Sequence, residues 1–143
     1  IRIKLRPDQQ PASSLNLYFD KGRKSIRDGR VHYEPRPWYE IEITTQKKEQ
    51  EQTGYPKGDF TAFVTDEDKS YQLEMTTCSG NKESPKAIQS KKRRILGEFI
   101  KGKLETKGSL KGFERVTSET LDHYGRDYIE FKQMSDKTYI LEF

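Results

Sequence analysis

The sequence is poor in the residues that form disulfides and metal centres. One cysteine, Cys78, and two histidines, His32 and His123, occur in 143 residues. A single cysteine excludes an internal disulfide and every cysteine-based zinc motif, and two separated histidines do not replace them. We therefore predict no metal and no cofactor, and we interpret Cys78 as a partly buried residue rather than a nucleophile. A lack of disulfides suits a reducing cytosol or nucleoid, where we expect the protein to be located.

Long apolar segments are also missing. No apolar run approaches the roughly 18 residues that a membrane span needs, and the N-terminus lacks the apolar segment of a signal peptide, so we expect no membrane partner. Only 31% of the residues are apolar and 35% are charged, a balance that raises the question of disorder. Eight tyrosines, seven phenylalanines and one tryptophan argue instead for a folded, β-rich domain with long solvated loops.

Positive charge is concentrated in two short segments, which we name the first arm (Lys21–Arg36) and the second arm (Cys78–Arg94). They hold 12 of the 27 lysines and arginines but only three of the 23 acids, Asp28, Glu34 and Glu83. The 33 residues of the two arms therefore carry a net charge of +9, whereas the other 110 residues carry −5. Two cationic segments on a mildly acidic body are typical of a protein that binds a polyanion, most often nucleic acid.

Alternation of apolar and polar residues predicts a mainly β fold. Tyr39, Ile41 and Ile43 are predicted to face inward from one strand, and Glu40 and Glu42 to face outward. The other strands predicted in this way are residues 1–5, residues 15–19, a hairpin over residues 60–75 that turns at Asp66-Glu67-Asp68, and a last hairpin over residues 129–143 that turns at Ser135-Asp136-Lys137.

Two helices are predicted in the C-terminal half. Apolar residues recur at helical spacing between Arg93 and Leu104. A shorter helix is predicted to run to His123, because Thr117 is a favourable N-cap and Gly125 a favourable C-terminal stop. Mostly strands with two helices favour a mixed or closed barrel over a flat sheet with exposed edges.

The chain is predicted to contain one folded domain. We assign residues 1–14 to a linker or N-terminal extension that enters from another domain, and residues 15–143 to the domain itself. Within the domain, residues 46–58 are charged and contain two glycines and a proline, so they are predicted to form an exposed connection.

Six short motifs follow one another after Ser14. They are Leu15-Asn16-Leu17-Tyr18-Phe19, Glu34-Pro35 with Tyr39, Phe60 to Asp66, Ile95-Leu96-Gly97-Glu98-Phe99, Thr117 with Leu121 and Tyr124-Gly125-Arg126, and Thr138-Tyr139-Ile140-Leu141-Glu142-Phe143. In this order and spacing they resemble the C-terminal domain of restriction endonucleases of the NgoFVII/NgoAVII type. Each motif is weak alone, and the ordered spacing gives the resemblance its specificity.

The resemblance implies a seven-stranded DNA-binding pseudobarrel with two helices, similar to the plant transcription-factor B3 domain. It also implies two recognition arms that enter the major groove, at the positions where the two charged segments lie. In such type II restriction endonucleases, which belong to restriction-modification systems, a phospholipase-D-like nuclease domain of the same polypeptide cuts the DNA, and we expect that domain to dimerise. Many relatives have Asn, Trp and Gln in the first arm, where this sequence has arginines, so the target sequence does not carry over.

The first arm contains side chains suited to base recognition. Arginine donates two hydrogen bonds to guanine O6 and N7, and aspartate accepts one from cytosine N4, so we predict a short double-stranded site that contains G·C pairs. The alternative for such a charged run is a solvated loop. The candidate DNA-binding residues are Lys21, Arg23, Lys24, Ser25, Arg27, Asp28, Arg30, His32 and Arg36.

The second arm combines polar side chains with a basic run. Asn81 and Gln89 offer the paired donor and acceptor that recognise adenine, and Gly80 allows a tight turn. The candidate base-contacting residues are Ser79, Asn81, Lys82, Glu83, Ser84, Lys86 and Gln89. Lys91, Lys92, Arg93 and Arg94 precede a predicted helix, where they are expected to hold a phosphate. The alternative for this run is a patch that only confers solubility or localisation.

The sequence offers little for catalysis within this chain. A phospholipase-D-type site requires His-x-Lys, and neither histidine is followed by that pattern. Glu105-Thr106-Lys107 and Glu130-Phe131-Lys132 resemble part of a magnesium-dependent nuclease site, but no upstream aspartate is placed to complete one. We therefore predict sequence-specific binding of double-stranded DNA without catalysis. A metal-dependent nuclease, a transcription-factor-like or RNA-binding barrel and a protein-interaction module remain alternatives.

Overall fold

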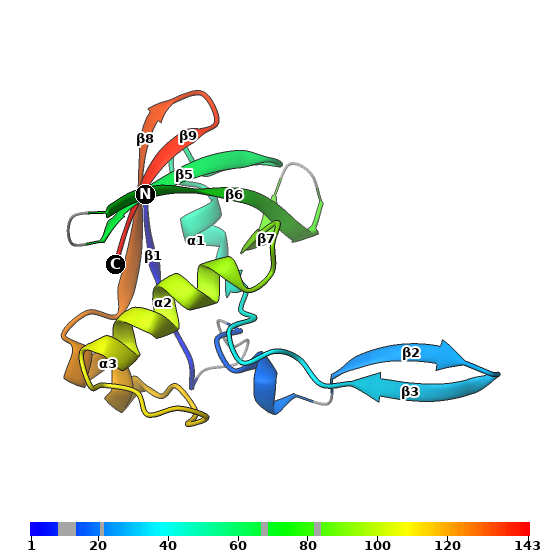
Figure 1. The fold of residues 1–143 in the computed structure, drawn as a ribbon. Helices are drawn as coiled ribbons and strands as arrows, with labels where there is room; N and C mark the ends of the chain where they lie inside the picture. Colours follow the sequence, from blue (N-terminus) through cyan, green and yellow to red (C-terminus); the bar gives the residue numbers. More distant parts are fainter. Residues whose placement is uncertain (9–13, 21, 67–68, 82–83) are drawn as a thin grey trace.

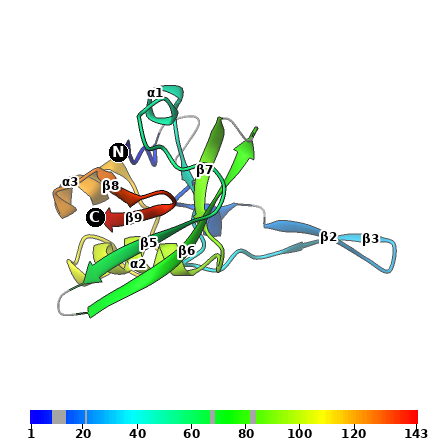
Figure 2. The same cartoon turned by 90° about the horizontal axis from the view of Figure 1, so that it is seen from above.

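A computed structural model describes residues 1–8, 14–20, 22–66, 69–81 and 84–143 of the chain. Seven strands form one curled sheet, a half-barrel, in the order β1-β8-β9-β5-β6-β7-β4, and every neighbouring pair is antiparallel except β5 and β9 (Figures 1 and 2). The strands are β1 (Arg2–Lys4), β4 (Ile43–Thr44), β5 (Phe60–Asp66), β6 (Lys69–Gly80), β7 (Pro85–Ser90), β8 (Tyr128–Ser135) and β9 (Thr138–Glu142). The predicted mainly β fold with seven barrel strands is confirmed.

The helices pack on this sheet as the apolar spacing predicts. α2 (Ile95–Thr106) buries Leu96, Phe99, Ile100 and Leu104 in the same core cluster as the inward side chains of the strands. α3 (Ser118–Tyr124) begins at the predicted N-cap, Thr117, whose hydroxyl accepts a hydrogen bond from the Thr120 N–H. It ends at Gly125, which has a left-handed conformation with φ +93°. Both predicted helices and both predicted hairpins are confirmed.

The N-terminal residues contribute to the core. β1 pairs with β8, and Ile3 and Leu5 are buried in the main cluster. The chain before residue 15, which sequence alone assigns to an extension, therefore supplies one strand of the sheet.

The strand predicted over residues 15–19 is wrong. A single turn of 3-10 helix, η1 (Leu17–Phe19), takes its place, although Leu15 and Leu17 are buried as the alternation indicates. Asn16 provides the physical reason. Its side-chain amide donates to the Val116 carbonyl at 3.0 Å and its oxygen accepts from the Val116 N–H at 2.8 Å. The Asn16 side chain thus forms paired hydrogen bonds with the Val116 backbone, in place of the backbone pairing that a strand would form.

The strand predicted from residue 39 is mostly wrong as well. Only Ile43 and Thr44 join the sheet, as β4, because the chain turns just before them, where the Glu40 N–H donates to the Pro37 carbonyl. The turn points Glu40 into the protein, where it is only 4% exposed, against the predicted outward position.

The predicted exposed connection over residues 46–58 contains a third helix. α1 (Lys47–Gln50) carries Glu49, which is buried against Arg6 with a 3.0 Å ion pair, and Tyr55 further along is also buried. The paired charges explain how a polar segment packs inside. Among the predicted turn and site residues, Lys21, Glu67, Asp68, Lys82 and Glu83 lie outside the described part of the chain.

Candidate nucleic-acid interface

The first arm folds into a hairpin that projects from the barrel. β2 (Arg23–Arg27) and β3 (Arg30–Glu34) form a separate two-stranded sheet, which Figure 1 shows extending away from the body. The turn between them is Asp28-Gly29, and both residues have positive φ angles, +52° and +73°. This two-residue geometry matches the right-handed twist of a hairpin and is favoured by an Asp-Gly pair.

The pairing register divides the hairpin into a polar face and an apolar face. Residues paired directly across an antiparallel ladder share one face, and successive residues alternate. The polar face consists of Arg23, Ser25, Arg27, Arg30, His32 and Glu34, and the apolar face of Lys24, Ile26, Val31 and Tyr33. No core covers the apolar face, since Ile26 is 72% exposed and Val31 is 52% exposed.

Some charged side chains of the hairpin form ion pairs within the protein and others do not. Arg27 forms an ion pair with Glu34 on the polar face. Within the described part of the chain, the side chains of Lys24 and Arg30 have neither a hydrogen bond nor an ion pair, and both are exposed. These two cations are therefore available to an external anion.

The second arm is also largely a hairpin. β6 continues to Gly80, and β7 returns antiparallel beside it, with Cys78 opposite Ala87. Ser79 and Gly80 both have left-handed conformations, with φ +60° and +72°. Beyond them the Asn81 side-chain oxygen accepts a hydrogen bond from the Ser84 N–H at 2.7 Å, so this predicted base reader also shapes the turn.

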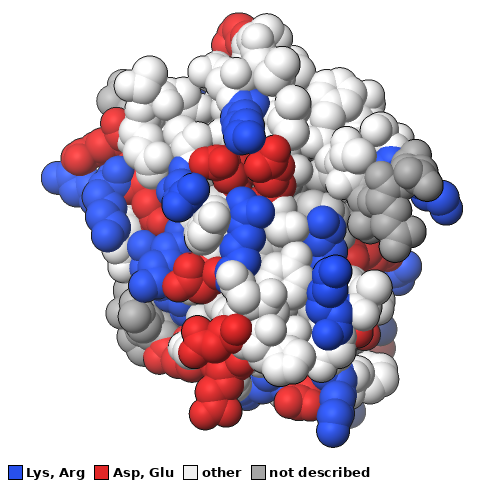
Figure 3. Space-filling model, turned by 90° about the vertical axis from the view of Figure 1, so that its left-hand side faces the viewer, with Lys and Arg blue, Asp and Glu red and all other residues white. Residues whose placement is uncertain are grey.

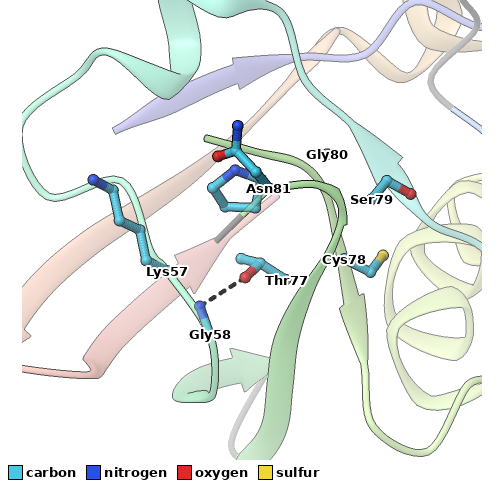
Figure 4. Close-up of a pocket in the computed structure, with 8 residues that line it drawn as sticks. Lys57, Gly58, Thr77, Cys78, Ser79, Gly80 and Asn81 are labelled. Atoms are coloured by element: carbon cyan, nitrogen blue, oxygen red, sulfur yellow. Dashed lines mark hydrogen bonds between the residues drawn. The ribbon is translucent and has the colours of Figure 1, made fainter. Parts of the chain in front are cut away.

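A shallow pocket of about 390 Å³ lies beside this turn (Figure 4). Its wall includes Lys57, Thr77, Cys78 and Asn81, and the Gly58 N–H donates to the Thr77 hydroxyl at 2.7 Å. Cys78 is half-buried, and burial raises the pKa of its thiol, so the neutral form predominates. A neutral thiol is a poor nucleophile, which agrees with the interpretation of Cys78 as a packing residue.

The basic run of the second arm connects β7 to α2. Lys91 is paired with Asp59 at 2.9 Å, and Arg94, the N-cap residue of α2, lies 3.9 Å from Glu98. All four residues of the run are exposed. Of the other predicted second-arm residues, Lys86 is exposed and Gln89 is half-buried on β7.

The two arms meet at a residue that sequence reasoning missed. Glu40 contacts Arg23, at the root of the first arm, and its Oε1 atom also lies 3.7 Å from Arg93 of the second arm. The pKa of Arg23 is lowered from its ordinary value, first by partial burial and then by the positive charges of Arg93 and Arg36. Two guanidinium groups, those of Arg23 and Arg93, therefore share one buried carboxylate.

The rest of the surface differs from the arms. In Figure 1 the first arm and the C-terminal end of β6 lie on the same side of the body. Figure 3 shows the opposite side, where Lys and Arg side chains alternate with Asp and Glu and no single sign dominates. The charge asymmetry found in the sequence is therefore also an asymmetry of the folded molecule.

The acidic residues considered for metal binding are spread over different elements. Glu105 lies in α2 and Glu130 in β8, where it is 3.8 Å from Arg2. Among the described residues, no group of three or more His, Cys, Asp or Glu side chains could hold a metal ion. In the same part of the chain, no helix is both long and apolar enough to span a bilayer.

Comparison with known proteins places this architecture in a family. No curated protein matches the sequence. A family model described as the NgoFVII C-terminal B3-like DNA-binding domain matches residues 1–135, almost the whole chain. The match includes both arms and every strand of the curled sheet except β9. The chain therefore belongs to the NgoFVII C-terminal B3-like DNA-binding domain family.

Proposed function

We propose that this chain recognises a short, specific double-stranded DNA site as the target-recognition domain of a type II restriction endonuclease. Cleavage is then the work of a phospholipase-D-like domain in the same polypeptide, which we expect to dimerise. The observation that carries the proposal is the first arm, a two-stranded cationic ribbon that stands clear of the barrel on the same side as the C-terminal end of β6.

The shape of the first arm suits the major groove. That groove is about 12 Å wide and admits a two-stranded β-ribbon. Five residues per strand give β2 and β3 a length of about 17 Å, which exceeds the roughly 8.5 Å depth of the groove. Arg30 and Asp28 at the tip are then the candidates for guanine and cytosine contacts, and Arg27 is a third if it leaves Glu34.

The second arm supplies contacts of a different kind. Asn81 and Ser84 sit at the turn of the β6–β7 hairpin, within reach of a second part of the groove. The run from Lys91 to Arg94 follows β7, and its exposed cations are suited to position the duplex through its phosphates without reading bases. Base contacts from the two turns and phosphate contacts from the basic run would together give sequence-specific binding.

Selection of duplexes from a random pool tests this proposal. The 143-residue chain is expected to enrich one short motif that contains G·C pairs. Binding to the enriched duplex should weaken with salt, with a log–log slope of roughly −4 to −7 if about five to eight phosphates are neutralised. A pool without an enriched motif, or binding that does not respond to salt, would refute the proposal. Tighter binding of RNA or single-stranded DNA than of the enriched duplex would favour the alternative barrel functions.

A further inference from the structure

A buried acid joins the roots of the two arms. The Glu40 side chain is 5% exposed, and it contacts the guanidinium of Arg23 from β2 and lies near that of Arg93, just before α2. Both contacts involve the same oxygen, Oε1. The other oxygen, Oε2, is buried and has no hydrogen-bond partner within the described residues.

The segment that carries Glu40 is held firmly by α2. Gly97 of α2 lies so close to the Tyr39 carbonyl that a Cβ atom added there would come within 1.6 Å of its oxygen. One helical turn later, the buried Lys101 ammonium donates to the Trp38 carbonyl at 2.8 Å. Both contacts hold the backbone of Trp38 and Tyr39 against α2, so the neighbouring Glu40 is anchored to the body and not to the hairpin.

In the described part of the chain, the strands of the first arm pair only with each other. β2 and β3 form their own two-stranded sheet, and such a hairpin is only marginally stable in water on its own. Arg23 is the first residue of β2, so its ion pair with Glu40 sets where the projecting ribbon leaves the body. Arg93 shares the same carboxylate and therefore ties the second arm to that point.

The geometry points to Glu40 as a positioning residue for DNA recognition: its carboxylate fixes the spacing and orientation of the two arms by holding Arg23 and Arg93 together. This inference rests on the proposed function. Without the carboxylate, the positive charge of Arg93 repels Arg23 with no anion between them, and Arg36 adds to the repulsion of Arg23. The arms then separate, and interactions with bases that need both arms in register no longer form.

The role predicts opposite changes on two kinds of DNA. Glu40→Gln preserves the size of the side chain and removes one negative charge. A purely electrostatic effect would strengthen binding to every duplex, because DNA is a polyanion. Loss of arm positioning instead weakens binding to the selected duplex by at least about tenfold, while binding to a scrambled duplex stays unchanged or strengthens.

Glu42→Gln is the matched control. Glu42 lies two residues away, is half-buried, and has no ion pair in the described part of the chain. The control makes the same charge change, so it should alter binding to the selected and scrambled duplexes by the same factor. Glu40→Asp, which keeps the charge on a shorter side chain, should restore part of the preference for the selected duplex.

Folding is followed separately through the single tryptophan, Trp38, whose fluorescence reports urea unfolding of each variant. If Glu40→Gln does not fold, Arg93→Gln provides the test, because the Arg93 side chain is 53% exposed and its replacement should leave the fold intact. Arg93→Gln should then lower the ratio of selected to scrambled binding more than Lys92→Gln does.

If Glu40→Gln changes the affinity for the selected and scrambled duplexes by the same factor, the positioning role is wrong and the proposed function is unaffected. The same holds for Arg93→Gln where that variant is the test. Failure of the unmodified chain to select any duplex would instead overturn the proposed function itself.

Discussion

Raising the pH above 8 should stabilise this protein through one buried lysine. Lys101 is fully buried in α2, with its ammonium 3.8 Å from the centre of the Trp38 ring and hydrogen-bonded to the Trp38 carbonyl. Burial lowers the pKa of Lys101 from 10.5 to about 8, and the negative charge of Glu105 opposes the shift. The unfolded chain, in which lysine has its ordinary pKa, therefore binds the proton more tightly.

The sign and size of the effect follow from proton linkage. Between pH 8 and 10.5 the unfolded state holds more protons than the folded state, so the free energy of unfolding rises with pH. A difference of 2.5 pKa units corresponds to about 3 kcal/mol in total. About 2 kcal/mol of this is expected between pH 7 and 9.5.

Urea unfolding at pH 7, 8, 9 and 9.5, followed by Trp38 fluorescence, measures the effect. Lys101→Met removes the titrating group and should show no such rise. The difference between the two proteins isolates Lys101 from Tyr39, Tyr55 and Tyr139, whose pKa values are raised and which destabilise the fold only at higher pH. Lys107→Met, an exposed lysine at the end of α2, should keep the pH dependence of the unmodified protein. Identical pH slopes in the unmodified protein and Lys101→Met would refute the lowered pKa.

Two further outcomes concern function. Arg30→Ala should weaken binding to the selected duplex by about 1–3 kcal/mol, with little effect on binding to a scrambled duplex. Lys92→Ala should weaken binding to both duplexes alike and reduce the salt slope by about one. If both variants lose the same binding energy on both duplexes at matched salt, the first arm supplies only charge. Excess protein incubated with supercoiled plasmid and magnesium should leave it intact, and nicking that disappears in Glu105→Gln or Glu130→Gln would reveal an intrinsic nuclease.

Sequence patterns were sufficient where burial follows a simple period. The hairpins at residues 60–75 and 129–143 alternate cleanly, and Thr117 and Gly125 bound α3 by local capping chemistry, so these elements were predictable. The segment at residues 15–19 also alternates, yet it forms a 3-10 turn, because the partner of Asn16 is Val116, a hundred residues away. No local pattern contains that contact.

In the candidate interface, too, features with a local sequence signal were predictable and those that depend on distant contacts were not. Charge clustering marked two segments that contain hairpins, whereas the Asp28-Gly29 pair, the strongest local signal for a hairpin, marks the turn of the first one. Glu40 had no comparable signal. In the sequence, Glu40 is one of many acidic residues next to apolar ones, a pattern that predicts exposure. Its burial depends on the turn at Pro37 and on Arg23 and Arg93, which are distant along the chain.

The anchoring of the first arm at Glu40 affects the entropic cost of binding DNA in the proposed function. Apolar side chains such as Ile26 and Val31 remain in water on the hairpin, so the hairpin gains little stability from burial in the free protein. A marginal hairpin must be ordered when it binds, and weaker anchoring at its root raises that entropic cost. In the positioning role proposed for Glu40, its ion pair with Arg23 lowers this cost for a duplex that engages both arms together. The proposed specificity then depends on a buried residue that contacts no base as well as on the exposed side chains proposed to contact bases.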